Sequence, residues 1–381
     1  MNRNISILLH DDWELRGDGV GDVADLQYLP MRMYLRVARE HGIRLTFMAD
    51  AMQQLCFLRY AGQSREVDLQ ARIWEEAILL AKEAGHDIQL HIHPQWYRAT
   101  YSNQVFHPVG SWDISAYPGE DRKEMLSGSI SYLRDLLQQA DASHTIIGFK
   151  AGGWALRSSP GILKELQSLG IRLVMGPGKA YRLRGSDFNA DYSEMEEDTL
   201  PYLADLEDPC RVAAEGTSEI IVLPMPFYEK RFLRKIADRI LRRSAPRHRE
   251  ISEATERMFF YWPRQPVNGV SRPPQTFWDN WRPANRLDRW LSRGKRRSLD
   301  ISLGDFHALK TALDAIMARY RDLPEEKVIL PLQSHSKTFR YNPSVIEKFF
   351  GYLLQSYGDE IEFLTLSDIW RNLSDYPVRM R

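Results

Sequence analysis

Three of the ten histidines lie close together in the segment HDIQLHIHPQW, residues 86–96. His91 and His93 lie in a short, mostly apolar run, which is typical of a buried β-strand. Side chains alternate between the two faces of a strand, so these two histidines point to the same face. Two imidazoles at this spacing can bind a single metal ion. Pro94 ends the strand at once and places both histidines at its C-terminal end. The alternative is that they are buried strand residues that pair with backbone groups.

Two adjacent aspartates, Asp11 and Asp12, follow the first apolar run, residues 4–10. In a strand they face opposite sides, unless the strand has already turned. Adjacent carboxylates at a buried strand end repel each other and are costly without a cation. A solvated loop or a helix cap would also account for the pair. Combined with His91 and His93, the pair predicts an aspartate and two histidines around an ion, with one position open for water.

Two further strand ends carry reactive side chains. Lys150 follows the apolar run 145–149 and precedes two glycines, where a buried lysine is expected to pair with a carboxylate. His335 follows the apolar run 327–332. A single histidine at a strand end is more often structural, but opposite a metal-bound water it is a natural general acid.

Short apolar runs alternate with helical patterns along most of the chain. Repeated strand–helix units place parallel strands at the centre and helices outside. Seven or eight such units favour a barrel over an open sheet, with the chemistry at the C-terminal ends of the strands. The expected strands are residues 4–10, 44–49, 87–93, 145–149, 171–175, 219–225 and 327–332, and the expected helices are residues 30–41, 68–84, 123–140, 159–169, 342–357 and 367–373.

One segment interrupts this alternation. Residues 228–300 hold 19 Lys and Arg against 8 Asp and Glu, and four of the ten tryptophans. We interpret them as a basic, Trp-rich insertion on a barrel formed by residues 1–227 and 301–381. The pattern of residues 228–243 predicts a helix with an aromatic and aliphatic stripe beside an arginine-rich flank. Such a helix could bind peripherally to an anionic membrane. Packing of that stripe on the barrel is the alternative.

The composition limits the classes of function. Lys plus Arg and Asp plus Glu are equal at 51 each, so net charge gives no basis for nucleic-acid binding. Cys56 and Cys210 are the only cysteines, which excludes a disulfide framework and a cysteine zinc cluster. The first residues lack the pattern of a signal peptide, and no apolar run reaches the roughly 20 residues that span a bilayer. These features predict a cytoplasmic protein, with residues 228–243 as the one candidate for membrane contact.

The order of the motifs resembles that of the polysaccharide deacetylases, the NodB-homology domain of the fourth carbohydrate-esterase family. The resemblance implies a distorted (β/α) barrel of seven or so parallel strands. It also implies a metal-dependent hydrolase that removes an N-acetyl group from an amino sugar of a surface polysaccharide or its precursor. The segments that carry it are LLHDD (8–12), RLTFMAD (44–50), LHIHP (90–94), FKAGGW (149–154) and ILPLQSH (329–335).

The resemblance assigns roles to the acid–base residues. Asp11 is implied as the catalytic base, oriented by Lys150, and His335 as the acid that protonates the departing amine. Lys150 stands where the family has an arginine, so it can pair with Asp11 but cannot hold it with a bidentate fork.

The resemblance also implies a ligand set. Asp12, His91 and His93 would bind one divalent ion, with zinc favoured and cobalt, nickel or manganese as substitutes. The family has three residues between its two histidines, whereas this chain has one. Trp96 and Trp154 are candidates for stacking on a sugar face, unless they belong to the core.

Two alternatives remain open at the level of sequence. One is a metal-dependent hydrolase of another C–N bond, such as an N-deformylase or a cyclic-amide hydrolase, with the same ligands but a different substrate. The other is a non-catalytic protein that binds glycans.

Overall fold

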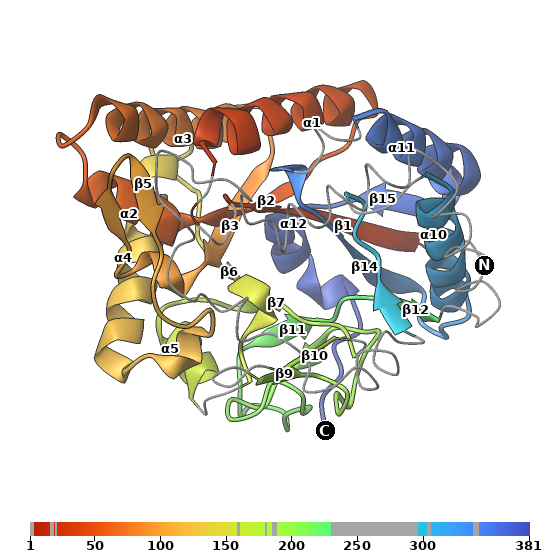
Figure 1. Cartoon of the computed structure of the whole chain (residues 1–381). Helices are drawn as coiled ribbons and strands as arrows, with labels where there is room; N and C mark the ends of the chain where they lie inside the picture. Colours follow the sequence, from red (N-terminus) through yellow and green to blue (C-terminus); the bar gives the residue numbers. More distant parts are fainter. Residues whose placement is uncertain are drawn as a thin grey trace, which may run out of the picture.

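The computed structural model describes residues 4–15, 19, 21–157, 161–179, 181–184, 189–229, 296–302, 306–337 and 343–381. Its centre is a nine-stranded sheet that is curled into a half-barrel (Figure 1). The strands are β1 (Asn4–Trp13), β2 (Thr46–Asp50), β3 (Asp87–Ile92), β6 (Gly148–Ala151), β7 (Leu173–Met175), β10 (Tyr202–Leu203), β11 (Ile221–Leu223), β14 (Lys327–Ser334) and β15 (Ile361–Phe363).

The strand order is β10-β11-β7-β6-β3-β2-β1-β14, and β15 adds to β1 beside β2. All pairs in this sheet are parallel except β10 with β11. In the described residues the two end strands pair with other segments, because Tyr202 bridges to Arg379 and Gln333 bridges to Asp300. The sheet is therefore a half-barrel and not the closed barrel favoured by the count of strand–helix units.

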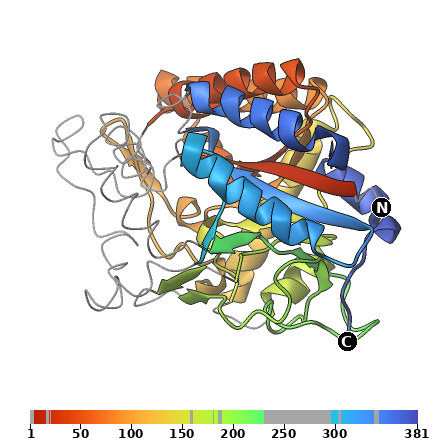
Figure 2. The ribbon, with the colours of Figure 1, turned by 90° about the vertical axis from the view of Figure 1, so that its right-hand side faces the viewer.

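Helices surround this sheet on its outer side (Figure 1). The view turned by 90° shows α1, α11 and α10 side by side as one layer over β1 and β14 (Figure 2), and Arg36 of α1 forms an ion pair with Glu347 of α11. The described α-helices on this side are α1 (Leu29–Glu40), α2 (Ala51–Arg59), α3 (Arg65–Glu83), α4 (Gly119–Leu137), α5 (Ile162–Ser168), α10 (Phe306–Arg321) and α11 (Pro343–Tyr357), whereas α12 (Leu366–Arg371) packs on the inner face.

Alternate residues of β1 enter two separate cores. Ile7 and Leu9 belong to the large core between the sheet and the outer helices. Leu8 belongs to a smaller core on the inner face, together with Leu366 and Ile369 of α12. Because side chains alternate along a strand, the residues after Leu8 on the inner face are His10, Asp12 and Glu14. The inner face is thus apolar at depth and polar at the C-terminal ends of the strands.

Most predicted elements are present, but two strands are longer than the apolar pattern indicated. The strand predicted for residues 4–10 continues to Trp13, and the strand predicted for 327–332 continues to Ser334. The helices α2 and α10 were not predicted. The extension of β1 decides which carboxylates share a face.

The predicted insertion, residues 228–300, lies almost wholly outside the described residues, and so does the predicted helix 228–243 beyond its first two residues. The described ends of the segment are β12 (Phe227–Glu229) and β13 (Arg296–Ser298), which pair antiparallel. Two other small antiparallel pairs are β4 (Thr100–Ser102) with β5 (Val105–His107) and β8 (Arg182–Arg184) with β9 (Asn189–Asp191).

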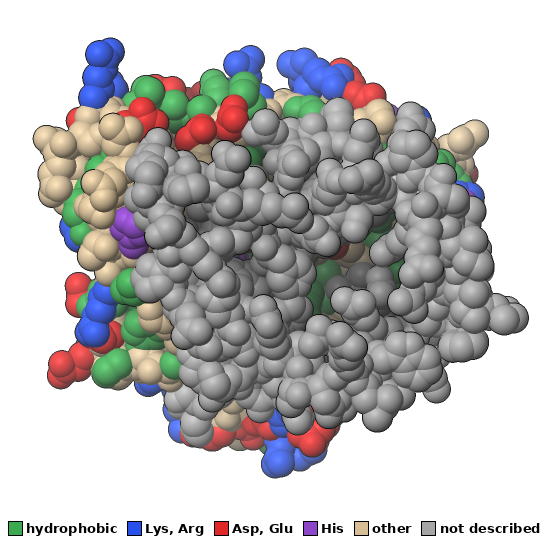
Figure 3. Space-filling model, viewed as in Figure 1, with side chains coloured by type: hydrophobic (Ala, Val, Ile, Leu, Met, Phe, Trp, Pro, Cys, Tyr) green, Lys and Arg blue, Asp and Glu red, His purple; other side chains and the backbone are tan. Residues whose placement is uncertain are grey.

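The described surface carries charges of both signs. Basic and acidic side chains alternate along the rim formed by α1 and α3 (Figure 3), as in the Arg36–Glu40 pair of α1. No helix in the described part of the chain is long and apolar enough to cross a bilayer.

Candidate active site

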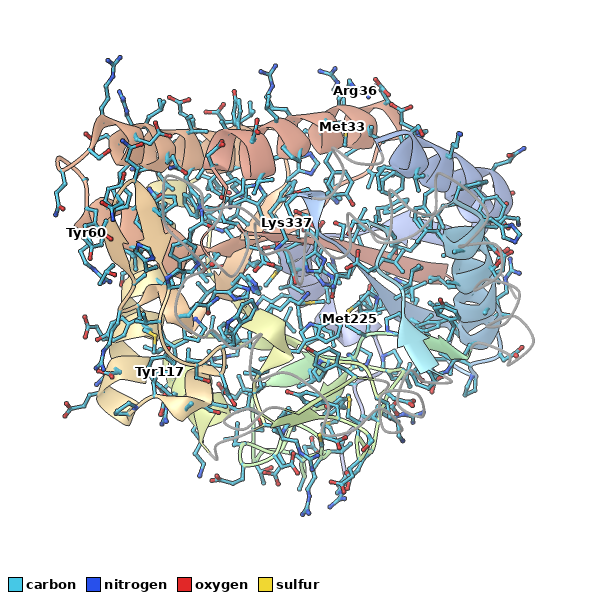
Figure 4. The ribbon with its side chains drawn as sticks, viewed as in Figure 1. Met33, Arg36, Tyr60, Tyr117, Met225 and Lys337 are labelled. Atoms are coloured by element: carbon cyan, nitrogen blue, oxygen red, sulfur yellow. The ribbon has the colours of Figure 1, made fainter. Side chains whose placement is uncertain are left out.

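The inner face of the half-barrel carries a cluster of buried polar side chains at the C-terminal ends of β14, β1, β3 and β6, with β2 lying between β1 and β3. Residues two apart along a strand share one face. β1 and β14, with the residues that follow them, each contribute three of these side chains, β3 and its next residue contribute two, and β6 contributes one. All of them are buried, and Figure 4 shows Lys337 near the middle of the molecule, where β14 ends. The set is His10, Asp12 and Glu14 from β1, His91 and His93 from β3, Lys150 from β6, and Gln333, His335 and Lys337 from β14.

Glu14 and the two histidines form the part of the cluster that could hold a metal ion. One ligand atom from each of Glu14, His91 and His93 lies within 4.8 Å of the other two, and all three residues are buried. Glu14 Oε2 is 3.1 Å from His91 Nε2 and also contacts His93 Nε2. Two imidazole nitrogens and one carboxylate oxygen are a donor set that zinc accepts.

The hydrogen bond on the far side of His91 fixes what its Nε2 can do. His91 Nδ1 lies 2.8 Å from the backbone oxygen of Lys150, which can only accept, so Nδ1 carries the hydrogen. In a neutral imidazole Nε2 then presents a lone pair to the Glu14 carboxylate. Two lone pairs at 3.1 Å repel each other unless a proton or a metal ion lies between them. The residues present therefore fit a cation at this position.

Lys337 holds the other oxygen of Glu14. Its Nζ donates to Glu14 Oε1 at 2.5 Å and to the Leu15 backbone oxygen at 3.3 Å. Burial by itself raises the pKa of Glu14, but the neighbouring His93 and Lys337 outweigh it and hold this pKa well below its ordinary value. Glu14 is consequently a carboxylate with one oxygen committed to Lys337 and the other directed at the two histidines.

Gly152, the residue that follows β6, lies against His93. An alanine Cβ at this position would lie 2.7 Å from His93 Nδ1 and 2.8 Å from the Ile92 backbone oxygen. Backbone cannot yield cheaply, so we expect Gly152→Ala to displace His93 and to weaken metal binding about 10–100-fold, measured by competition with a chelator. Gly351→Ala is the control, because a Cβ there meets nothing within 4 Å. Unchanged metal affinity in Gly152→Ala would contradict a role for His93 at the ion.

A second group lies next to the metal-binding group. Lys150 Nζ donates to Asp12 Oδ1 at 2.6 Å, and His335 Nε2 lies 3.4 Å from Asp12 Oδ2. His335 Nδ1 in turn lies 2.6 Å from Asp300 Oδ2. Asp12 thus faces a cation with one oxygen and an imidazole with the other.

The charges in this second group set the protonation states. Burial raises the pKa of Asp12, but Lys150 and His335 outweigh it and hold the pKa well below its ordinary value. Burial likewise lowers the pKa of His335, but Asp300 outweighs it and leaves the pKa above 6.5. Asp12 is therefore ionised, and His335 keeps its proton to a higher pH than an ordinary histidine.

Asp11 lies on the opposite face of β1 from Asp12. Its carboxylate accepts from Ser334 Oγ at 2.6 Å, from the Ser336 backbone N–H at 2.8 Å and from Ser336 Oγ at 2.8 Å. It joins the ends of β1 and β14 beneath the outer helices. The resemblance implied a contact of Lys150 with Asp11, but Lys150 contacts Asp12. The reason is that β1 continues to Trp13, so its side chains keep alternating between the two faces of the sheet.

The structure also differs from the predicted ligand set. The carboxylate that contacts His91 and His93 is that of Glu14, two residues beyond Asp12 on the same face. Sequence reasoning missed Glu14, Lys337 and Asp300. Strand alternation continued past the last apolar residue of β1 would have found Glu14, whereas Lys337 lies in a helical turn beyond the end of β14. Asp300 carries no such signal, because it joins the site through an isolated bridge to Gln333.

The two predicted sugar-stacking tryptophans have different surroundings. Trp96 is buried and packs edge-on against Phe57 and Phe106, as a core residue does. The Trp154 ring lies 5.2 Å from Lys150 Nζ, and its φ of 56° is unusual for a bulky residue. A third tryptophan, Trp112, packs edge-on against His93 with ring centroids 4.8 Å apart.

No protein-family model and no curated protein sequence matches the chain. Among solved structures, it is similar to a Mycobacterium smegmatis protein provisionally named a polysaccharide deacetylase, with a TM-score of 0.52, 12% identity and coverage of 100% of this chain and 94% of that one. The likeness shows the fold alone. A second neighbour is Puue allantoinase, with a TM-score of 0.46, 14% identity and coverage of 98% of this chain and 92% of that one. The half-barrel is thus a fold that includes a protein named as a deacetylase.

Proposed function

We propose that this protein is a metal-dependent hydrolase that removes an N-acetyl group from an amino sugar of a polysaccharide or its precursor. The observation that carries the proposal is the convergence of His91 Nε2 and His93 Nε2 on one oxygen of Glu14, in a buried site where the His91 tautomer leaves a lone pair facing that carboxylate. The adjacent Asp12 and His335 supply a base and an acid.

Glu14, His91 and His93 would hold a divalent ion, with zinc the best match to the donors. When bound, such an ion polarises a carbonyl and lowers the pKa of a water molecule. Asp12 Oδ2 is the carboxylate oxygen not bound to Lys150, and it would accept the proton of the attacking water. Lys150 keeps Asp12 ionised and fixes which of its oxygens is available.

His335 would deliver the proton that the departing amine needs. Its Nδ1 is held by Asp300, so Nε2 is the nitrogen that faces the reaction space and Asp12. Asp300 also stabilises the imidazolium, which supports donation at neutral pH. With Asp12 on one side and His335 on the other, the site has separate groups for accepting and donating the proton.

The decisive assay measures acetate and free amine from a panel of N-acetylated amino sugars, oligosaccharides and cyclic amides, with the metal-loaded protein. Release of acetate from an N-acetyl sugar supports the proposal. Turnover of cyclic amides alone would assign the site to another C–N hydrolase. Tight glycan binding without turnover would identify a non-catalytic protein.

We expect Glu14→Gln to lower bound metal below one equivalent, because the amide removes the only anionic ligand. Elemental analysis of the purified protein, without chelator in the buffers, measures this directly. Glu165→Gln is the matched control, since Glu165 pairs with Arg122 away from the site. A wild-type protein that takes up no metal even when metals are added would refute the metal centre.

A further inference from the structure

Gln333 lies between Lys150, which contacts the proposed base Asp12, and Asp300, which contacts the proposed acid His335. Its Oε1 accepts from Lys150 Nζ at 2.9 Å, and its Nε2 donates to Asp300 Oδ2 at 3.1 Å. The orientation of the amide is dictated by charge, because an ammonium group can only donate and a carboxylate can only accept. Gln333 is thus tied to the residue that holds Asp12 and to the residue that holds His335.

These contacts close a ring. From Lys150 the ring passes to Asp12 at 2.6 Å, from Asp12 to His335 at 3.4 Å, and from His335 to Asp300 at 2.6 Å. Gln333 then joins Asp300 back to Lys150. Asp12, Lys150, Gln333 and His335 are buried, and the side chain of Asp300 is 9% exposed, so the contacts are little exchanged with water and each is stronger than it would be at the surface.

A third acceptor completes the position of Lys150. His10 Nε2 lies 3.1 Å from Lys150 Nζ, so the three hydrogens of the ammonium group meet Asp12, Gln333 and His10. Burial and then the charge of Lys150 hold the pKa of His10 well below its ordinary value. A neutral His10 can accept at Nε2, and three acceptors in fixed directions determine where the ammonium group lies.

We propose that Gln333 is a positioning residue that couples Asp12 to His335 by fixing Lys150 and Asp300 relative to each other. The inference rests on the proposed function in that Asp12 and His335 are taken as the reacting groups. Gln333 itself faces charged partners with both ends of its amide and is not assigned a contact with the substrate.

Two substitutions of Gln333 should disturb the contacts of this ring in different ways. Gln333→Leu leaves one hydrogen of the Lys150 ammonium and one lone pair of Asp300 without their partner. Gln333→Glu keeps an acceptor for Lys150 but sets a second carboxylate against Asp300, which repels it. A residue that merely filled space would tolerate the second change, which conserves shape.

The kinetic test compares both variants with wild type and with Gln54→Leu. Gln54 is the matched control, since it is a buried glutamine bonded to Ala71, Glu75 and Tyr132 away from the ring. Both Gln333 variants should lose about 10²-fold in kcat with KM and bound metal unchanged, because misplacement of reacting groups has costs of this size. Gln54→Leu should lower the melting temperature and leave kcat unchanged. Wild-type kcat in Gln333→Glu would overturn the proposal.

A second readout needs no turnover. The ammonium hydrogens of a lysine with three buried acceptors exchange slowly, so Lys150 should give a ¹H–¹⁵N signal in the wild-type protein that Lys150→Met removes. Gln333→Leu should abolish or shift this signal while the spectrum of the remaining protein is retained. An unchanged Lys150 signal would overturn the inference. If the signal responds but wild type hydrolyses no acyl sugar, the positioning role stands and the proposed function fails.

Discussion

Asp12→Asn is expected to lower kcat by about 10²–10⁴-fold, the range for loss of a general base. Bound metal should remain, since Glu14, His91 and His93 are intact. The amide keeps the shape of the side chain but cannot accept the proton from water. It also leaves the buried Lys150 without its counter-charge, so circular dichroism at the assay temperature must accompany the rate measurement.

Asp11→Asn provides the comparison, because Asp11 is the base implied by the family resemblance. Its contacts to Ser334 and Ser336 predict that Asp11→Asn changes the stability of the protein and leaves kcat near the wild-type value.

Burial raises the pKa of Asp11 to about 6 despite its hydrogen bonds to Ser334 and Ser336. The folded state therefore binds a proton that the unfolded state releases between pH 3.8 and about 6, and this residue's contribution makes stability fall as pH rises through that window. Loss of turnover in Asp11→Asn with activity retained in Asp12→Asn would restore the assignment implied by the resemblance.

His335→Gln is expected to lower kcat by about 10²–10⁴-fold at neutral pH, because the leaving amine loses its proton donor. The wild-type enzyme should lose kcat as pH rises through the pKa of His335, which Asp300 keeps above the ordinary 6.5. Removal of that charge in Asp300→Asn lowers the pKa of His335, so the alkaline limb of the kcat profile should move to lower pH. A series of kcat measurements across pH on the three proteins tests both expectations.

The pH profile also separates chemistry from folding. If His335 were only structural, His335→Gln would lower the melting temperature and the wild-type limb would remain. An alkaline limb that stays in place in Asp300→Asn would show that another group donates the proton.

The α/β alternation and the strand ends that carry the candidate site could be predicted from the sequence, whereas the open half-barrel and the contacts within the candidate site could not. Apolar runs separated by helical patterns marked the main strands, and Pro94 marked the end of β3. The requirement for an apolar run ended the predicted first strand at His10, because the segment from His10 to Trp13 includes three polar residues. In the structure these three are buried strand residues whose partners are the charged Lys150 for His10 and Asp12 and the hydroxyls of Ser334 and Ser336 for Asp11, so hydrophobicity underestimated the length of the strand.

The length of β1 changes which carboxylates face the site. With β1 ending at His10, Asp11 and Asp12 could be assigned freely to base and ligand. With β1 continuing, alternation places Asp12 and Glu14 together and Asp11 against β14. Contacts such as Asp300 with His335 depend on a chain crossing that no local pattern encodes.

The pairing of β1 with β14 has a consequence for biosynthesis. Asp11 and Ser334 are bonded partners that lie 323 residues apart in the chain. At 5–20 residues per second, a ribosome needs about 15–65 s to deliver the second after the first. During that time one edge of β1, with its buried polar residues, has no strand beside it, and such edges invite pairing with other chains. This edge of β1 is covered only after β14 has been made, and a product that ends before residue 327 would lack His335 and this partner strand.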